Sequence, residues 1–226
     1  MYVKFRIIVF IFFCFLFSAC KKDGPLFRVY GSITTINGGN AEIKAIVENE
    51  FGNCMTGAVV FVSDSKNSVT IMDYNSNSCC YTAVVDAIED DIYTITVDSI
   101  AIGKNIVITI PHTRLSTKPT ILSFSDSNGN TVLSGDSLSK DCASYAAWES
   151  CGNDVVYHIS IKSPLTTLWS GSSSSTSIDI PPYILKPGIY YLCVTAQKIY
   201  GDPYFSSADY YSVSSIDSSN IQFYVE

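Results

Sequence analysis

The chain has 226 residues, of which 47% are hydrophobic, 13% aromatic and only 15% charged, and its formal net charge is −7. This composition can build a packed core and excludes a disordered chain. The negative charge excludes a protein that binds nucleic acid through a basic surface, because phosphate groups require the opposite sign.

The N-terminal segment has the features of a secretion signal. Lys4 and Arg6 precede an unbroken apolar run over residues 7–17. The run is shorter than the roughly 20 residues that a helix needs to span a bilayer. We therefore expect a signal peptide over residues 1–19 rather than a core helix or a signal anchor, since charged and helix-breaking residues follow at 21–25.

The end of this signal resembles the lipobox of bacterial lipoproteins. The four residues are Phe17-Ser18-Ala19-Cys20, with Phe where the family usually has Leu, Val or Ile. The resemblance implies that Cys20 is lipidated with acyl chains such as palmitate, and that residues 20–26 form a tether. Two or three acyl chains anchor a protein stably. The charged stretch 21–23 resembles the signal for surface export in one Gram-negative group, which implies a surface-exposed, lipid-anchored protein of the outer membrane.

The next part of the chain, residues 27–112, reads as a β-sandwich. Short alternating runs are separated by turns, with the hairpin signal Asn-Gly-Gly-Asn at 37–40, and no helical period appears. About seven strands are expected, at 27–36, 41–48, 57–63, 68–73, 80–86, 92–97 and 105–110. Residues 50–60 resemble a turn of bacterial immunoglobulin-like modules. The proline-containing segment 111–119 is the expected linker.

Residues 118–226 are predicted to form a second sandwich. The predicted fold class is therefore all-β, with two tandem β-sandwiches. Strands are expected at 120–125, 131–134, 144–148, 155–162, 167–169, 177–180, 189–196 and 221–225, with a hairpin loop at 171–177. The stretch 185–196 resembles the corner and sixth strand of fibronectin type III domains. The resemblance makes Tyr190 the corner tyrosine and Trp148 the core tryptophan.

Six cysteines remain beyond Cys20, and an exported chain meets an oxidising compartment. Their pairing cannot be deduced from sequence. Cys142 and Cys151 flank a turn and are the expected local disulfide. Cys54 can pair with either Cys79 or Cys80 at strand ends of the first sandwich.

The sequence contains no recognisable catalytic constellation, so we expect no enzyme, no cofactor and no metal site. Its two histidines, His112 in the linker and His158 in a strand, lie far apart. The acidic run 89–91 is interpreted as a solvated turn. The stretch 126–131 echoes a calcium loop but has Thr131 in place of the required Gly, so a hairpin turn is expected.

Two further sets of residues are candidate sites. Exposed aromatic side chains can stack on sugar rings or anchor a protein, and the candidates lie after the corner strand: Tyr200, Tyr204, Phe205, Tyr210 and Tyr211. The alternative is that they pack over the edge of the second sandwich. Asp-Ser-apolar triplets at Ser99 and Ser137 resemble O-glycosylation sites of the same bacterial group.

Two functions follow from these features. The first is a lipid-anchored, non-catalytic surface module for binding or adhesion, with a glycan or protein partner and the membrane held through Cys20. In that reading the first sandwich is a stalk and the second presents the loops. The alternative is a structural accessory subunit of an outer-membrane assembly, such as one for polysaccharide uptake.

Overall fold

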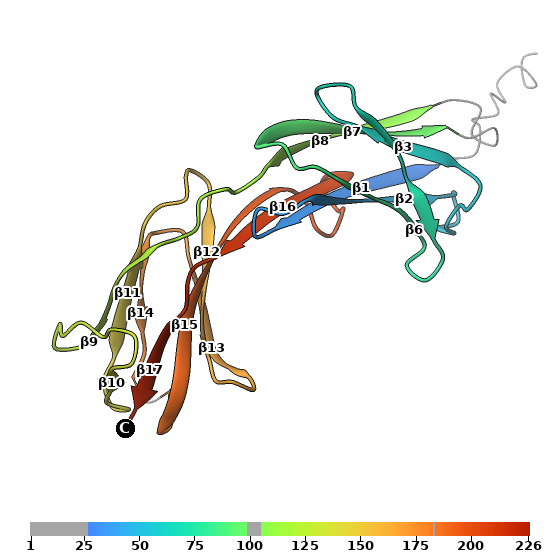
Figure 1. Cartoon of the computed structure of the whole chain (residues 1–226). Helices are drawn as coiled ribbons and strands as arrows, with labels where there is room; N and C mark the ends of the chain where they lie inside the picture. The colour runs from blue at the N-terminus through green and yellow to red at the C-terminus, as the bar shows by residue number, and fades with distance from the viewer. Residues whose placement is uncertain (1–26, 99–104, 183) are drawn as a thin grey trace, which may run out of the picture.

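The computed structural model describes residues 27–98, 105–182 and 184–226, and every regular element in these ranges is a β-strand. Figure 1 shows two β-sandwiches that meet at an angle. The all-β fold class with two sandwiches is therefore confirmed. The expected signal peptide and tether lie outside the described residues.

The first sandwich packs a five-stranded sheet against a four-stranded sheet. The five-stranded sheet has the order β16 (Tyr210–Asp217), β1 (Arg28–Ile36), β2 (Ala41–Glu48), β6 (Cys80–Val85) and β5 (Asp73–Asn75). The four-stranded sheet has the order β4 (Val69–Ile71), β3 (Val59–Ser63), β7 (Asp90–Asp98) and β8 (Ile106–Thr113). The β1–β2 hairpin turns at Asn37 and Gly38, which both have positive φ, as a tight two-residue turn requires.

Alternation along the strands builds the core of this sandwich. Every second residue of β1, β2 and β7 is buried, so one face of each sheet is apolar. Tyr93, Ile33, Ile43 and Ile95 are fully buried between the sheets. Gly31 lies where a Cβ atom would clash with the side chain of Ile110, so the sheets approach closely there.

The second sandwich has a larger and a smaller sheet. The larger one contains β10 (Ser137–Leu138), β17 (Ile221–Val225), β15 (Gly188–Gly201), β12 (Val156–Lys162) and β13 (Thr167–Ser173). The smaller one contains β14 (Ser177–Ile180), β11 (Ser144–Trp148) and β9 (Ile121–Asp126). A separate apolar core fills the space between them.

The core residues that the fibronectin resemblance implied occupy the expected places. Trp148 is 1% exposed, and its ring centroid lies 5.3 Å from that of Tyr157. The hydroxyl of Tyr190 donates a hydrogen bond to the carbonyl of Lys186 at 2.8 Å, which is the tyrosine-corner contact. These predictions are confirmed.

The C-terminal hairpin joins the two sandwiches. Along β15, residues 188–192 pair with β17, residues 191–197 pair with β12, and residues 195–201 pair with β16, so only residues 198–201 extend beyond both strands of the second sandwich. β16 then lies parallel to β1, with Gly31 opposite Tyr210 and Ile36 opposite Ser215. One continuous sheet therefore runs through both sandwiches (Figure 1).

Several local expectations differ from the structure. The expected strand 68–73 is split into β4 and β5, which belong to different sheets, and the acidic run 89–91, expected as a solvated turn, enters β7 with Asp91 buried. Residues 131–134 form only an isolated bridge, and β13 continues to Ser173 into the expected loop. β8 continues through Pro111 to Thr113, so the expected linker begins inside a strand, and His112 belongs to that strand.

The fibronectin resemblance places Tyr211 and Ser212 in the last strand region of the second sandwich, but they belong to β16, which pairs with β1 of the first. The rest of β16 was not predicted, because the residues it buries include Ser212 and Ser214 instead of an apolar series.

Candidate binding surface

The loop at residues 202–209, which we call the aromatic loop, connects β15 to β16 and is organised by one carboxylate. Asp202 accepts hydrogen bonds from the backbone amides of Tyr204 at 2.8 Å and of Ser206 and Ser207, each at 2.9 Å. The Ser206 hydroxyl and the Tyr204 amide hold the pKa of Asp202 well below its usual range. The loop is thus pre-organised by its own sequence.

The aromatic loop presents one side chain to solvent beside a pair of stacked rings. Tyr204 is 87% exposed. The neighbouring Phe205 packs on Tyr30 of β1, with ring centroids 5.0 Å apart and planes inclined by 41°. An exposed tyrosine ring can stack on a sugar or on an apolar side chain.

The other aromatic candidates attach the hairpin to the first sandwich. The hydroxyl of Tyr200 lies 2.9 Å from that of Thr113 in β8, and the Lys198 ammonium lies 5.6 Å from the centre of its ring. Tyr210 packs against the core of the first sandwich, and Tyr211 is half-buried. The cluster therefore lies on the first sandwich, not over the edge of the second, because β15 carries it there. The expectation that the second sandwich presents this loop is wrong.

A row of buried polar groups lies where β16 covers β8, and we call it the polar seam: Thr35, His112, Ser212 and Ser214. Nδ1 of His112 lies 2.6 Å from the Ser212 hydroxyl, and Nε2 lies 3.3 Å from that of Thr35. Burial lowers the pKa of His112 to about 4. The amide of Leu115 donates to the Ser214 hydroxyl at 2.7 Å. These bonds attach the hairpin to β8.

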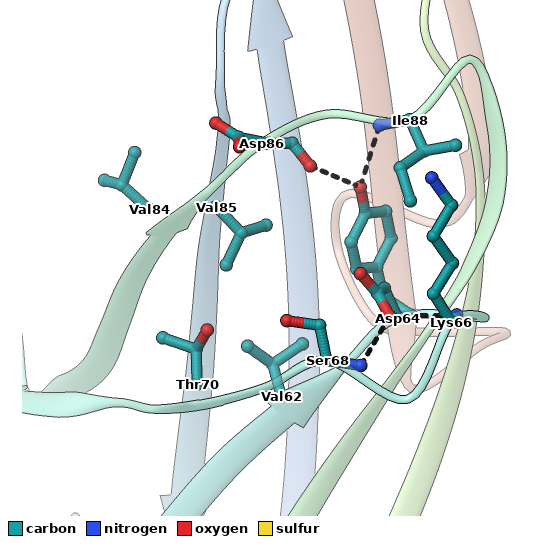
Figure 2. Close-up of a pocket in the computed structure, with 10 residues that line it drawn as sticks. Val62, Asp64, Lys66, Ser68, Thr70, Val84, Val85, Asp86 and Ile88 are labelled. Carbon is teal, nitrogen blue, oxygen red and sulfur yellow. Dashed lines mark hydrogen bonds between the residues drawn. The ribbon is translucent and has the colours of Figure 1, made fainter.

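A pocket of about 390 Å³ opens between the two sheets of the first sandwich, within the size range of small-ligand sites (Figure 2). The hydroxyl of Tyr93 accepts a bond from the amide of Ile88 at 3.3 Å and donates to the carbonyl of Asp86 at 3.4 Å. The Asp64 carboxylate accepts the amides of Lys66 and Ser68 at 2.9 and 2.8 Å, so it holds the β3–β4 turn. The pocket is built mainly by groups that already bond one another.

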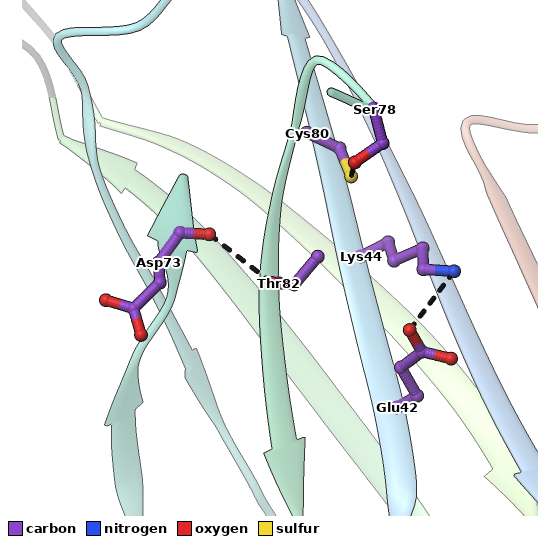
Figure 3. A network of polar contacts seen from close by, with 6 residues as sticks. All are labelled: Glu42, Lys44, Asp73, Ser78, Cys80 and Thr82. Atoms are coloured by element: carbon purple, nitrogen blue, oxygen red, sulfur yellow. Dashed lines mark hydrogen bonds and ion pairs between the residues drawn. The ribbon is translucent and has the colours of Figure 1, made fainter. Parts of the chain in front are cut away.

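The outer faces of the two sheets of the first sandwich differ in charge. On the five-stranded sheet, Lys44 pairs with Glu42 at 3.2 Å, beside Asp73 and Thr82 (Figure 3). This is an ordinary solvated face. The outward positions in the middle of the four-stranded sheet are apolar or carry hydroxyl groups, and they are half-buried or exposed: Val59, Phe61, Ser63, Val69, Ile71, Ile92, Thr94, Thr96, Val107 and Thr109. Exposed apolar faces of this kind mark interaction sites.

The remaining sequence candidates are distributed over the chain. Cys20 and Ser99 lie outside the described residues. Ser137 is exposed in β10, and its hydroxyl donates to the Glu226 carboxylate at 2.7 Å. Cys142 and Cys151, the expected disulfide, both carry free thiols in the structure.

The residues considered for metal binding form other contacts. His158 is exposed and bonds Ser172 and Gln197 at 2.9 and 3.0 Å. The Asp126 carboxylate accepts the amides of Asn128 and Asn130 at 2.9 and 2.8 Å, as in a hairpin turn. Within residues 27–98, 105–182 and 184–226, no group of three His, Cys, Asp or Glu side chains is placed to hold a metal ion. In the same ranges, no helix has the length and hydropathy to cross a membrane.

Solved structures match this chain at low sequence identity and low TM-score. No family model and no curated protein matches the sequence. The BSP domain of a biofilm-associated protein is 16% identical at a TM-score of 0.30; the match covers 87% of this chain but only 29% of the other. The fibronectin(III)-like modules of Clostridium thermocellum CbhA are 11% identical at a TM-score of 0.39, covering 89% and 94%. The Yersinia pseudotuberculosis adhesin InvE is 10% identical at a TM-score of 0.28, covering 90% and 61%.

Proposed function

We propose that the chain is a non-catalytic binding or adhesion module, held at the outer-membrane surface by lipidated Cys20, and that the aromatic loop is its contact surface. The observation that carries the proposal is the 87% exposure of Tyr204 on a loop whose backbone is fixed by Asp202. An aromatic side chain that contributes little to the core, on a loop ordered in advance, is suited to binding.

The physical argument concerns what binding costs. A flexible loop loses conformational freedom when it engages a partner, and that loss subtracts from affinity. Tyrosine has two side-chain torsions and a large amphipathic surface, so it contributes contact area at a small entropic cost. Because the Asp202 carboxylate orders the loop before any partner binds, the remaining loss of conformational entropy on binding is mainly that of the Tyr204 side chain.

The anchor supplies the location in this proposal. Removing the first 20 residues, which hold Lys4 and Arg6 and no acidic residue, changes the net charge from −7 to −9. A strongly acidic chain is repelled by anionic lipids. The acyl chains on Cys20 would therefore hold the protein at the membrane, leaving the aromatic loop to meet its partner.

A glycan array probed with the 24–226 fragment tests the binding function. Selective binding to a set of glycans supports it, with a sugar as the partner class. If the fragment binds no glycan on the array and the full chain co-purifies with a membrane channel, the binding function is contradicted and the second function below is favoured.

The second candidate function is an accessory subunit of an outer-membrane assembly. The observation favouring it is the outer face of the four-stranded sheet, whose outward positions between Asp90 and Asp98 of β7 carry no charge. Thr96 lies in the middle of that face, and Thr82 lies on the charged face of the other sheet. Both are half-buried strand residues. If the uncharged face binds a subunit, Thr96→Lys abolishes co-purification from native membranes and the matched control Thr82→Lys does not. Equal yields for both variants would contradict this second function.

A further inference from the structure

Cys54 and Cys79 approach each other at the edge of β2. Cys54 bridges Glu48 in antiparallel pairing, and the amide of Met55 donates to the carbonyl of Val47 at 2.8 Å. β6 pairs with β2 as far as Tyr81, which lies opposite Ala45. Because β1 occupies the other edge of β2, the segment at Cys54 and the start of β6 lie end to end along one edge.

Tyr81 fastens these two segments together. Its hydroxyl donates to the carbonyl of Met55 at 2.9 Å and accepts the amide of Ala58 at 3.1 Å. Its ring packs 5.1 Å from that of Tyr74, centroid to centroid. The backbone on both sides of the cysteine pair is therefore held in place without a covalent link.

Cys54 lies opposite Glu48 of β2, and β6, which begins directly after Cys79, pairs with β2 as far as Tyr81 opposite Ala45, so the two cysteines are neighbours along this edge. The nearby Cys79 thiol and burial raise the pKa of Cys54. Cys79 is exposed and Cys54 is half-buried, so an external oxidant can reach the pair. Cys80 lies on the other side of β6, where its Sγ atom is 3.1 Å from the Ser78 hydroxyl, beside Lys44 (Figure 3). The structure thus separates the two adjacent cysteines that the sequence left as alternatives.

We propose that Cys54 and Cys79 form a disulfide bond when the protein meets a disulfide oxidant. The two thiols form one S–S bond and release two protons and two electrons, and the oxidant's disulfide is reduced to two thiols. Formation in the cell rests on the export included in the proposed function, whereas formation in vitro does not. The bond closes a loop of about 25 residues that contains β3 and β4 of the four-stranded sheet and β5 of the five-stranded sheet.

Oxidation of the full chain, purified in detergent and reduced beforehand, tests the proposal. The reduced protein is treated with oxidised glutathione, the remaining thiols are alkylated, and peptides are mapped by mass spectrometry. The expected product is a peptide pair that links Cys54 to Cys79, with a Tm about 5–10 °C above that of the reduced protein. Cys80→Ser keeps both results, and Cys79→Ser loses both.

The control and the contradicting results are specific to this pair. Replacing Cys142 and Cys151 with Ser leaves the Tm difference unchanged, because both lie in the second sandwich. A link from Cys54 to Cys80 in the wild type, or separate glutathione adducts on Cys54 and Cys79, would overturn the proposal. Peptide mapping of the oxidised wild type tests the Cys54–Cys79 link even if a variant folds poorly. Glycan binding by the reduced protein is measured separately, so failure of the disulfide leaves the proposed function standing.

Discussion

Nδ1 of His112 lies 2.6 Å from the hydroxyl oxygen of Ser212, although 100 residues separate them in the sequence. His112 belongs to β8 of the first sandwich, and Ser212 belongs to the hairpin that extends from the second. Both side chains are almost fully buried. This contact, at the centre of the polar seam, is part of what holds the aromatic loop in position against the first sandwich.

Stability should fall in mildly acidic solution because of His112. Burial lowers its pKa to about 4 in the folded protein, whereas an unfolded histidine titrates near 6.5. Between these values the unfolded chain binds the extra proton and the folded chain does not. The stabilisation is complete above pH 6.5, decreases as the pH falls toward 4, and amounts to about 3 kcal/mol.

Urea unfolding of the wild type and two variants between pH 7.5 and 4 measures this effect. His112→Gln should flatten the pH dependence in the 6.5–4 interval, and His158→Gln should retain it, because His158 is exposed. If the His112→Gln curve keeps the wild-type slope, the assignment to this side chain is wrong.

Ser214→Ala should destabilise the attachment of the hairpin. Its hydroxyl is the acceptor for the Leu115 amide, and removing it leaves a buried donor without a partner, at a cost of about 1–3 kcal/mol. Ser215→Ala is the matched control, since the neighbouring side chain is half-buried on the alternate face of β16. Urea unfolding at pH 7.5 checks the difference, and equal losses for the two variants would argue against the role of the polar seam.

Gly201→Ala should damage the hairpin more than Gly52→Ala damages its turn. Both glycines have φ near +76°, so an alanine at either site is strained by about 1–2 kcal/mol. A Cβ atom at Gly201 would also clash with the carbonyl oxygen of Tyr210, whereas Gly52 faces open space. We expect a loss of at least about 3 kcal/mol for Gly201→Ala. Comparable unfolding midpoints for the two variants would contradict this geometry.

Cys20→Ser should release the protein from the membrane. A serine cannot accept the thioether-linked lipid, and the acidic remainder of the chain has little affinity for anionic lipids. Fractionation of cells expressing each form, together with metabolic labelling by a clickable palmitate, checks the outcome. Label on the variant, or unchanged membrane retention, would show that something other than Cys20 anchors the chain.

The sequence predicts the sandwiches well because their cores obey simple alternation. β2, β11, β14 and β17 have the expected bounds, and Tyr190 makes the expected corner bond. Each of these features depends on local pattern, namely a turn, a two-residue period or a short motif.

The features that position the candidate surface depend on contacts that no local pattern records. The buried face of β16 includes Ser212 and Ser214, so its sequence reads as a polar loop, although it pairs in parallel with β1 from the other end of the chain. The sequence identified the aromatic residues but not the sandwich on which they lie. The match of Tyr211 and Ser212 to the last strand region of the fibronectin family indicated a strand here, but it gave no sign that the strand pairs with β1.

Binding by a Tyr204→Ala variant on the glycan array tests the central claim most directly. Phe51→Ala is the matched control, because Phe51 is also an exposed aromatic residue, 78% exposed, on a different turn of the same sandwich. The account predicts that Tyr204→Ala loses at least about tenfold in affinity, the equivalent of about 1.4 kcal/mol, while Phe51→Ala binds as the wild type does. If Tyr204→Ala binds with the affinity of the wild type, or if both variants lose affinity equally, the account is contradicted.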